Sequence, residues 1–456
     1  MLNTRNHLIA KMWAVTITQP QLNHHLPRSI MIYRLVYTLI MLLVCPFLLF
    51  GLYKRKPGKP AFGSRWKEHF GFTPALLQND KPVIWVHAVS VGESIAVTPV
   101  LKSLQQSYPQ YQIVVTTTTS TGAEQIAKLT GVTHRYMPID FSWCVRRFLN
   151  VIKPQVMIIM ETELWPNTLA SVAAKAIPII LLNGRLSARS ARRYGKFKGA
   201  FAQLGGKLSH LLTVHQDDAS RFIALGVPAN KVTVTGSIKY DIQLPKETLR
   251  QGAELRQQLG HQRPVFIAAS THQGEDEQVL SAFKAVQKSI KEALLILVPR
   301  HPERFQTVFE LCQSQGFNVQ KRTEPQTITS DLEVYLGDTM GEMLTLMAAA
   351  DVTVMGGSLL GDKVGGHNLL EPAALAKPSI IGPSYFNFSD ITEQLQQAGA
   401  THVCANSQQL AQQLIALLKD KDQQQVMGKH ALNVVNRNKG AVDKSITLIG
   451  NYLTPS

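Results

Sequence analysis

Two series of short apolar segments alternate with helical patterns along most of this 456-residue chain. Each segment is a continuous apolar run, which is typical of strands buried on both faces of a parallel sheet. The first series lies at residues 83–88, 113–117, 156–160, 177–183, 211–215 and 232–234, and the second at residues 265–269, 293–299, 333–336, 351–355 and 379–381. Because the two series are of similar size, we predict an α/β protein with two Rossmann-like domains.

The predicted domain boundaries follow from the segments between these series. Residues 236–249 separate the two series and are the expected linker. We expect an N-terminal domain over residues 57–235 and a C-terminal domain over residues 250–456, with its last helix packing back on the N-terminal domain. Residues 1–30 are polar and unpatterned, and we interpret them as a leader that precedes a start at Met31. Residues 31–56 are the expected membrane anchor.

The anchor contains a segment, residues 35–53, without a charged side chain. A helix that spans a bilayer needs about 20 apolar residues, so the segment is just long enough. Pro46 and Gly51 also allow a helix that lies in the membrane interface, and both alternatives stay open. The basic residues Lys54, Arg55, Lys56 and Lys59 follow at once, which places the globular part on the cytoplasmic side.

Two segments carry almost all of the formal net charge of +16. Residues 1–80 hold ten basic and two acidic residues, and residues 185–207 hold seven basic residues and no acidic one, which gives +8 and +7. Such segments attract nucleic acid or anionic lipid, or form a solvated basic face. The nearby apolar segment favours anionic lipid and argues against nucleic acid. The residues expected to contact lipid are Arg185, Arg189, Arg192, Arg193, Lys196 and Lys198.

The cysteines indicate the redox compartment. Cys45, Cys144, Cys312 and Cys404 are widely separated, and no two of them form a Cys-x-x-Cys pair. This spacing argues against a disulfide framework and against a zinc site, so it favours a reducing compartment.

A glycine-rich segment follows the apolar strand at residues 351–355. Gly356-Gly357-Ser358 comes directly after this strand, and Gly365-Gly366-His367-Asn368-Leu369-Leu370-Glu371 comes shortly afterwards. Glycines let backbone amides approach a phosphate, and Asn368 stands where the N-cap of a helix is expected. Glu371 is then placed to accept hydrogen bonds from sugar hydroxyls. The segment predicts a nucleotide site, and the alternative is a turn beside a capped helix.

Polar residues also follow other strands, at the edge where ligands of such sheets bind. In the second half, Arg300 suits a phosphate or carboxylate, and Gly337 to Glu342 is expected to converge on the glycine-rich segment. In the first half, Glu93 is either a general base or a first-turn residue that complements a helix dipole. Glu161 follows another strand, and Lys239 lies in the linker.

Seven of these motifs occur in the order typical of 3-deoxy-D-manno-octulosonic acid (Kdo) transferases, and the chain resembles that family from Met31 onward. The motifs are residues 87–93, 161–167, 185–190, 236–241, 299–304, 337–342 and 365–371. The resemblance implies a GT-B fold and an inverting glycosyltransferase that needs no metal or other cofactor. It also implies transfer of Kdo from CMP-Kdo to the lipid A precursor at the cytoplasmic face of the bacterial inner membrane.

The resemblance further implies roles for single residues. Glu93 is similar to the general base of the family, and Glu161 and Lys239 are similar to residues that stabilise the transition state. The implied CMP contacts are Pro299, Arg300, Met340, Gly341, Glu342, Asn368, Leu369, Leu370 and Glu371. This chain departs from the family pattern in two places. The loop at residues 359–364 is longer than in the family, and the leader at residues 1–30 is additional. Two alternatives are a GT-B enzyme that uses a UDP-sugar and a membrane-tethered nucleotide-binding module without activity.

Overall fold

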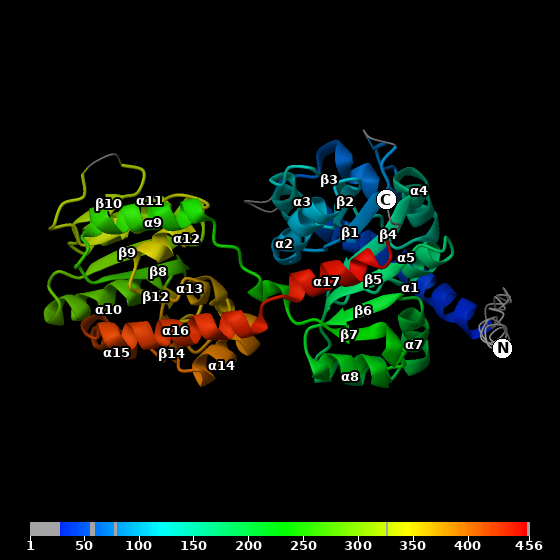
Figure 1. Cartoon of the computed structure of the whole chain (residues 1–456). Helices are drawn as coiled ribbons and strands as arrows, with labels where there is room; N and C mark the ends of the chain where they lie inside the picture. The colour runs from blue at the N-terminus through cyan, green and yellow to red at the C-terminus, as the bar shows by residue number, and fades with distance from the viewer. Residues whose placement is uncertain (1–27, 55–59, 77–79, 325–326, 454–456) are drawn as a thin grey trace, which may run out of the picture.

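The computed structural model describes residues 28–54, 60–76, 80–324 and 327–453 (Figure 1), and side chains from residue 32 onward. Most of the predicted leader, with Arg55, Lys56 and Lys59, lies outside the described residues. The chain forms two domains, each built on a seven-stranded sheet in which every strand pair is parallel. The predicted fold class, GT-B with two Rossmann-like domains, is confirmed.

The N-terminal sheet has helices on both faces. Its strands, in their order across the sheet, are β3 (Val132–Tyr136), β2 (Gln112–Thr117), β1 (Val83–His87), β4 (Pro154–Met160), β5 (Ile179–Gly184), β6 (His210–Thr213) and β7 (Val232–Val234). The helices are η1 (Gly63–Phe70), α2 (Val91–Ser107), α3 (Ser120–Ala127), α4 (Ser142–Ile152), α5 (Pro166–Ala173), α6 (Ala188–Gly195), α7 (Lys198–Gly206) and α8 (Gln216–Ala224). Side chains alternate along β1, so Ile84 and Val86 enter one core cluster and Trp85 enters the other.

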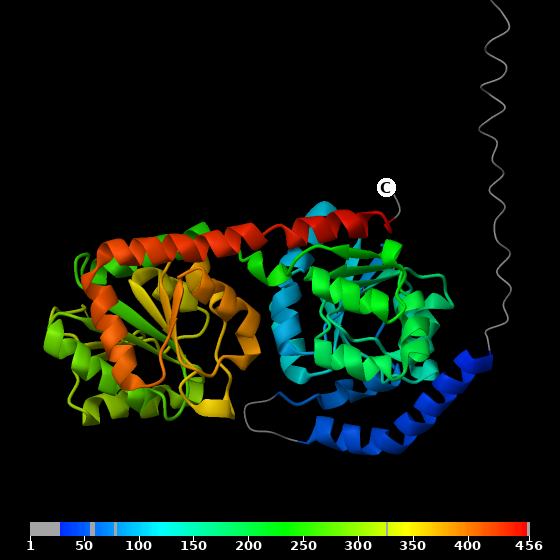
Figure 2. The same ribbon diagram turned by 90° about the horizontal axis from the view of Figure 1, so that it is seen from below.

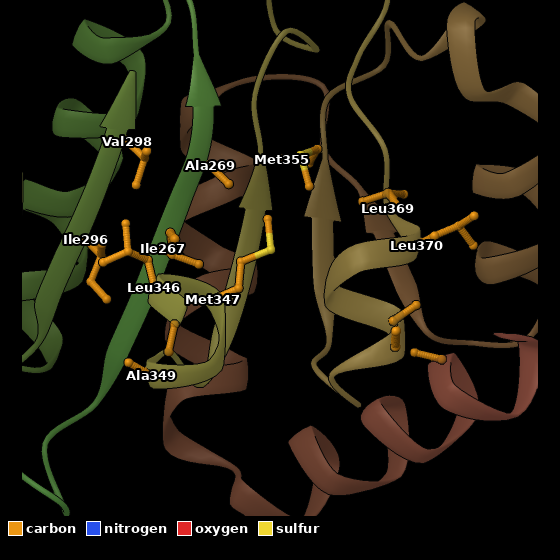
Figure 3. Packing of buried hydrophobic residues seen from close by; sticks show 14 of the residues in the cluster. Ile267, Ala269, Ile296, Val298, Leu346, Met347, Ala349, Met355, Leu369 and Leu370 are labelled. Atoms are coloured by element: carbon orange, nitrogen blue, oxygen red, sulfur yellow. The ribbon is translucent and has the colours of Figure 1, made fainter. Parts of the chain in front are cut away.

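The C-terminal sheet repeats this plan. Across the sheet lie β10 (Val319–Lys321), β11 (Val334–Leu336), β9 (Leu294–Pro299), β8 (Val265–Thr271), β12 (Val352–Met355), β13 (Ser379–Ile381) and β14 (Thr401–Val403). The helices are α9 (Lys246–Leu259), α10 (Asp276–Ser289), α11 (Phe305–Ser314), α12 (Met343–Ala349), α13 (Leu370–Ala374), α14 (Ser389–Gln397), α15 (Ser407–Lys419) and α16 (Lys421–Asn438). Figure 3 shows one of its two core clusters, in which Ile267 and Ala269 of β8 pack with residues of β9, α12 and α13.

Three strands have no counterpart in the sequence prediction: β3, β10 and β14. All three lie at an edge of their sheet. An edge strand is covered less completely, and the residues of β3 are mostly half-buried. Such strands therefore lack the continuous apolar run by which the other strands were found.

The chain crosses between the domains twice. The first crossing contains η3 (Ile238–Tyr240), and α9 begins at Lys246, inside the predicted linker. The second joins α16 to α17 (Ala441–Gly450), and both helices run along one side of the molecule in Figure 2. The apolar side chains of α17 enter the N-terminal core, as the sequence analysis expected. The carboxylate of Asp241 ties the crossings together, because it accepts hydrogen bonds from the amides of Gly440 and Val442, each at 2.7 Å.

The predicted anchor is a helix, α1 (Arg28–Tyr53), at the side of the N-terminal domain (Figure 2). Over residues 32–53 it is long and apolar enough to cross a membrane, and only 6% of its most apolar window is buried. Length and composition alone do not decide how such a helix meets a membrane, because a core helix or a signal sequence has the same properties.

Candidate active site

Glu93 lies in the first turn of α2, just beyond the end of β1. Its carboxylate accepts hydrogen bonds from the amide of Val89 and the hydroxyl of Ser90, both at 2.9 Å. The Ser90 hydroxyl in turn accepts from the Glu93 amide at 3.4 Å and so caps the helix, while the Glu93 carboxylate reaches back to the amide of Val89, the residue before the N-cap. This geometry therefore also fits the alternative role of Glu93, in which it stabilises the start of α2 and is not a general base.

The electrostatics of Glu93 nevertheless suit a base. Burial raises the pKa of this carboxylate above its ordinary value, the hydrogen bonds from Val89 and Ser90 lower it, and the nearby carboxylates of Glu161 and Glu163 raise it again. A carboxylate with a raised pKa takes up a proton more readily near neutral pH than an ordinary glutamate does. Glu93 is half-buried, so an acceptor hydroxyl can reach it.

Glu161 and Lys239, which are far apart in the sequence, form an ion pair at the same sheet edge. Glu161 follows β4 and Lys239 lies in η3, and the Lys239 Nζ is 3.5 Å from the Glu161 Oε1. About one third of each side chain is exposed, so the pair lies at the surface of the domain. Because Glu161 also raises the pKa of Glu93, the three predicted catalytic residues occupy one neighbourhood.

Backbone strain marks the carboxyl ends of three strands. Glu161 after β4, Asn183 in β5 and Ser270 in β8 all have φ between 55° and 60°, a region that residues other than glycine rarely adopt. Such strain concentrates at ligand sites, where the surrounding structure holds it in place. Ser270 escaped the sequence analysis, because nothing in its sequence context signals a left-handed backbone.

The first half of the glycine-rich segment is already occupied by a carboxylate of the same chain. Glu275 is 1% exposed and accepts hydrogen bonds from the amides of Gly357 (2.6 Å), Ser358 (2.8 Å) and Leu359 (2.9 Å). It also accepts from the amide of His272 at 3.1 Å. The sequence analysis assigned amides of this segment to a phosphate, and for these three amides that assignment was wrong. Glu275 instead supports the loop from inside the domain.

The second half of the segment keeps amides available for a ligand. The amides of His367, Asn368 and Leu369 have no hydrogen-bond acceptor within the described part of the chain. Gly365 has φ +86°, and a Cβ atom there would lie 2.5 Å from the ring of Phe386. Only glycine therefore lets the chain pass this ring and bring the following amides to the surface.

The helix after this segment starts one residue later than predicted. α13 begins at Leu370, with Leu369 rather than Asn368 at the N-cap position, and it has only five residues. The Asn368 side chain still serves the helix start, because its Oδ1 accepts a hydrogen bond from the Leu370 amide at 3.1 Å. The loop at residues 359–364, which is longer than the family pattern, contains a short turn, η5 (Gly361–Lys363).

Three of the predicted CMP contacts have side chains that fill the core. Leu369 and Leu370 are fully buried, and both lie in the cluster shown in Figure 3. Pro299 is buried at the end of β9, opposite Thr271 of β8. These residues can therefore contact a nucleotide only through their backbone atoms, and their buried side chains hold that backbone in position.

A group of basic and imidazole side chains surrounds the remaining CMP contacts. Arg300 is exposed directly after β9, and its charge lowers the pKa of Glu371, which burial raises. The Nε2 atoms of His272 and His367 are 2.8 Å apart. Burial, together with the nearby His272, Arg300 and His301, lowers the pKa of His367 to about 4. At neutral pH these imidazoles are uncharged hydrogen-bonding groups beside one fixed cation, which suits a nucleotide phosphate.

Of the predicted CMP contacts after β11, two lie in an open turn and the third is bound within the domain. Met340 is 65% exposed and Gly341 has φ +88°, so both lie in an open turn. The carboxylate of Glu342 is bound within the domain, because its Oε1 is 3.0 Å from the Arg322 Nη2 and Thr339 also donates to it. The hydrogen bond from Arg322 lowers the pKa of Glu342. A ligand would have to share this carboxylate with Arg322.

Acidic and metal-binding residue types do not gather into a metal site in the described part of the chain. Among the described residues, no group of three or more His, Cys, Asp or Glu side chains is arranged to hold a metal ion. One Asp-x-Asp triplet occurs, at Asp420-Lys421-Asp422. Asp420 is the N-cap of α16, where its carboxylate accepts a hydrogen bond from the Gln423 amide at 2.8 Å. The triplet therefore has a structural role at the junction of α15 and α16.

The basic segment around α6, residues 185–198, contains residues with two different kinds of surroundings. Arg185 forms an ion pair with Asp390 of α14, so it joins the two domains, which the sequence analysis did not foresee. The other five predicted lipid contacts, Arg189, Arg192, Arg193, Lys196 and Lys198, are all exposed. Phe197 lies among them and is 69% exposed.

An apolar pocket of about 1120 Å³ lies between the end of α1, η1 and the start of α3. Leu49, Phe50, Trp66 and Phe70 form apolar walls, and Thr119 to Thr121 line its polar end. This polar end is close to the Glu93 loop, because the amide and hydroxyl of Thr118 donate to the Val89 carbonyl at 3.2 and 3.0 Å.

Comparison with known proteins gives this geometry its chemical context. A family model described as 3-Deoxy-D-manno-octulosonic-acid transferase (kdotransferase) matches residues 64–242, and one described as Glycosyl transferases group 1 matches residues 255–434. The 3-deoxy-D-manno-octulosonic acid transferase of Haemophilus influenzae is 37% identical, over 92% of this chain and 99% of its own length. The chain belongs to the Kdo transferase family. It is therefore a glycosyltransferase, and a nucleotide-binding module without activity is excluded.

A solved structure shares the fold of this Kdo transferase. UDP-GlcNAc 2-epimerase from Neisseria meningitidis, bound to UDP-GlcNAc, has a TM-score of 0.54 at 15% identity, over 81% of this chain and all of that one. At this identity the likeness concerns the fold alone. The C-terminal CMP-Kdo binding domain of WaaA from Acinetobacter baumannii is 36% identical over 42% of this chain and all of that one, with a TM-score of 0.40.

Proposed function

We propose that this Kdo transferase moves Kdo from CMP-Kdo to a lipid A precursor at the cytoplasmic face of the bacterial inner membrane. The transfer inverts the anomeric carbon and needs no metal ion or other cofactor. The observation that carries the proposal is the position of Glu93, a half-buried carboxylate with a raised pKa beside the Glu161–Lys239 pair. A protein that only binds a nucleotide has no use for such a group on the domain that does not hold the nucleotide.

In the proposed step, a hydroxyl oxygen of the acceptor attacks the anomeric carbon of Kdo while Glu93 takes up its proton. The new oxygen–carbon bond forms as the bond between this carbon and the phosphate of CMP breaks. Because base and leaving group lie on opposite sides of the carbon, its configuration inverts. The Kdo unit is transferred without oxidation or reduction, and CMP leaves with the electron pair of the broken bond.

The leaving phosphate requires a positive or hydrogen-bonding environment. Arg300, the free amides at His367 to Leu369 and the imidazoles of His272 and His367 supply donors for it at one edge of the C-terminal sheet. Lys239 lies in the first crossing between the domains, where its Nζ is 3.5 Å from the Glu161 Oε1, and can add a further positive charge. These groups support a mechanism in which amides and basic side chains take the place of a divalent cation.

The acceptor side of the proposal rests on apolar surface near the base. A lipid acceptor needs room for acyl chains close to the hydroxyl that reacts. The pocket between α1, η1 and α3 offers this room, since its polar end adjoins Val89, in the loop just before the helix that carries Glu93. The exposed basic residues of α6 suit the phosphate groups of such a lipid.

The test is a donor and acceptor panel with the purified full chain. CMP-Kdo and several UDP-sugars are each incubated with a lipid A precursor in detergent, with and without excess EDTA, and the lipid product is analysed by mass spectrometry. We expect a mass increase of one or more Kdo units from CMP-Kdo alone, at the same rate in EDTA. Transfer from a UDP-sugar would refute the donor assignment, and a loss in EDTA that magnesium restores would refute the metal-free mechanism.

A further inference from the structure

We propose that α1 lies in the plane of the membrane and does not cross it: its outer face enters one anionic leaflet while its inner face stays on the N-terminal domain. This inference concerns how the protein is held at a membrane and goes beyond the proposed reaction. It is carried by the contacts of α1, which extend along almost the whole helix.

A buried polar network holds the first half of α1. The Arg34 guanidinium donates to the Asn167 Oδ1 (3.2 and 3.3 Å) and to the Ser142 Oγ (3.1 Å), and the Asn167 Nδ2 donates to the Thr38 hydroxyl at 3.0 Å. Asn167 is 1% exposed, and its backbone amide donates to the buried carboxylate of Asp140 at 3.0 Å. Hydrogen bonds from a charged group at such a site fix the position of the helix.

Apolar and aromatic contacts hold the second half. Cys45 is buried in a small cluster with Phe141 and Cys144, and Met41 and Leu49 pack against the same cluster. The Tyr53 hydroxyl is 2.8 Å from the His69 Nδ1. The contact positions, residues 34, 38, 41, 45, 49 and 53, recur every three or four residues and therefore form one stripe. At 1.5 Å per residue, the stripe is about 28 Å long.

The opposite face of α1 is apolar and exposed throughout. Its most exposed side chains are Leu35 (60%), Leu43 (75%), Phe47 (79%) and Phe50 (72%), and Leu39 is 52% exposed. An uninterrupted apolar surface of this size on a soluble domain marks an interaction with a membrane or a partner. Because basic residues lie nearby on α6, the exposed Phe197 precedes α7, and α7 packs against α1, an anionic lipid surface is the partner that fits.

The two faces together exclude a spanning position for the folded protein. The hydrocarbon core of a bilayer is about 30 Å thick, so spanning would use the same residues that the inner stripe attaches to the domain. Either the domain surface beside α1, with Arg146 and Arg147 exposed, would enter the hydrocarbon, or Arg34 would leave its partners and enter it alone. Both are costly, because charged groups in hydrocarbon must be solvated or paired.

The test measures the depth of the outer face in a membrane. Leu35, Leu39, Leu43, Phe47 and Phe50 are each replaced by cysteine in the full chain, spin-labelled and bound to vesicles that contain anionic phospholipid. The four native cysteines are buried and stay unlabelled in the folded protein. Depth is read from the relative access of oxygen and of a water-soluble relaxation agent. Val426, 50% exposed on α16, is labelled as the control that stays in water.

A helix in the membrane plane gives nearly equal depths at all five positions, within about one helical turn, or roughly 5 Å. A spanning helix gives a maximum near Leu43 and values about 12 Å shallower at Leu35, since eight residues separate them. That profile would overturn the proposal, as would five labels that remain in water. In the Arg34→Leu variant we expect the profile to become uneven at Leu35 and Leu39. An unchanged depth profile would show that the polar network of Arg34 does not hold the first half of α1 on the domain.

Discussion

The carboxyl edges of the two sheets are built on nearly the same scaffold and carry opposite chemistry. The strand orders differ in the place of the fourth strand of each domain: β4 lies between β1 and β5, whereas β11 lies between β10 and β9. At the N-terminal edge the carboxylates of Glu93 and Glu161 are accessible, and Glu161 raises the pKa of Glu93 and forms an ion pair with Lys239. At the C-terminal edge the Glu275 carboxylate is turned inward, and the remaining groups are the exposed Arg300 and the half-buried imidazoles of His272 and His367, whose pKa values are lowered mainly by burial.

This difference shows how the side chains at the edge of a Rossmann-like sheet decide which part of a reaction that edge can carry out. An edge with accessible carboxylates can accept a proton, and an edge with amides and one guanidinium can hold an anion. The same residue type, glutamate, serves both edges, and its direction decides the role. The predictions below are ordered by expected effect, and each one tests a part of this contrast.

The largest effect is expected for Glu93→Gln. The amide keeps the capping hydrogen bonds in part and cannot act as a base, so transfer should fall by about 100-fold or more. Binding of CMP, measured by calorimetry, should stay within a factor of about two because the proposed function assigns CMP to the other domain. Glu124→Gln, at an exposed site on α3, is the matched control. Near-normal transfer by Glu93→Gln would end the assignment of the base.

A smaller effect, with the opposite signature, is expected for Glu275→Gln. An amide offers its NH₂ group to amides that need an acceptor, so the loop at Gly357 to Leu359 loses part of its support. Charge-assisted hydrogen bonds of this kind contribute about 1.5–3 kcal/mol, which corresponds to a rise of about 10- to 100-fold in the donor KM. The neighbouring exposed residue provides the control variant, Glu277→Gln. If kcat fell and the donor KM did not change, Glu275 would not be a positioning residue of the donor site.

The exposed basic residues of α6 should affect the acceptor rather than the donor. Changing Arg189, Arg192, Arg193 and Lys196 to Gln removes four charges, each of which contributes up to about 1 kcal/mol near an anionic surface before salt screening. We expect the acceptor KM to rise by about 10-fold at physiological salt, and less at high salt. A larger rise in the donor KM would contradict the role in docking.

The pH dependence of transfer tests the electrostatics of Glu93. A base must be deprotonated, and the pKa of Glu93 is raised mainly by burial. As the pH falls, kcat should therefore decline at a higher pH than an ordinary glutamate would cause, with a limiting slope of tenfold per pH unit. The residual activity of Glu93→Gln should lack this slope. A slope that persists in the variant would assign the titration to another group.

The smallest effect is expected for the ion pair that joins the two domains. Both partners of the Arg185–Asp390 pair are more than 40% exposed, so the pair should contribute no more than about 1 kcal/mol to stability. We expect Arg185→Ala to shift Tm by only a few degrees and to change transfer less than threefold. A loss of transfer comparable to that of Glu93→Gln would show that closure of the domains depends on this contact.

Much of the fold followed from the pattern of apolar runs, because strands buried on both faces must be apolar along their whole length. Edge strands such as β3 and β14 were missed, since they are covered on fewer sides. The motif order was sufficient to place Glu93, Glu161 and Lys239 at strand ends and crossings. Their meeting could only be seen in three dimensions, because 78 residues separate Glu161 from Lys239 (239 − 161).

The glycine-rich segment shows where sequence reasoning ends. Its composition correctly indicated a backbone that needs glycine, as the contact of Gly365 with Phe386 demonstrates. It could not show that Glu275, more than 80 residues earlier, takes the amides of Gly357 to Leu359. The partner of a backbone amide depends on which side chain the fold brings to it, and the amide itself carries no sequence signal.

By itself, the sequence determined the two α/β domains, the family and the residue types at the strand ends, because periodicity and local motifs are properties of neighbouring residues. Only the tertiary structure decided which carboxylates face a ligand and which support a loop. It also decided that α1 lies along its domain, through the contacts of Arg34, Cys45 and Tyr53. These outcomes depend on contacts between distant segments, whose free energy comes from burial and hydrogen-bond pairing in the folded chain.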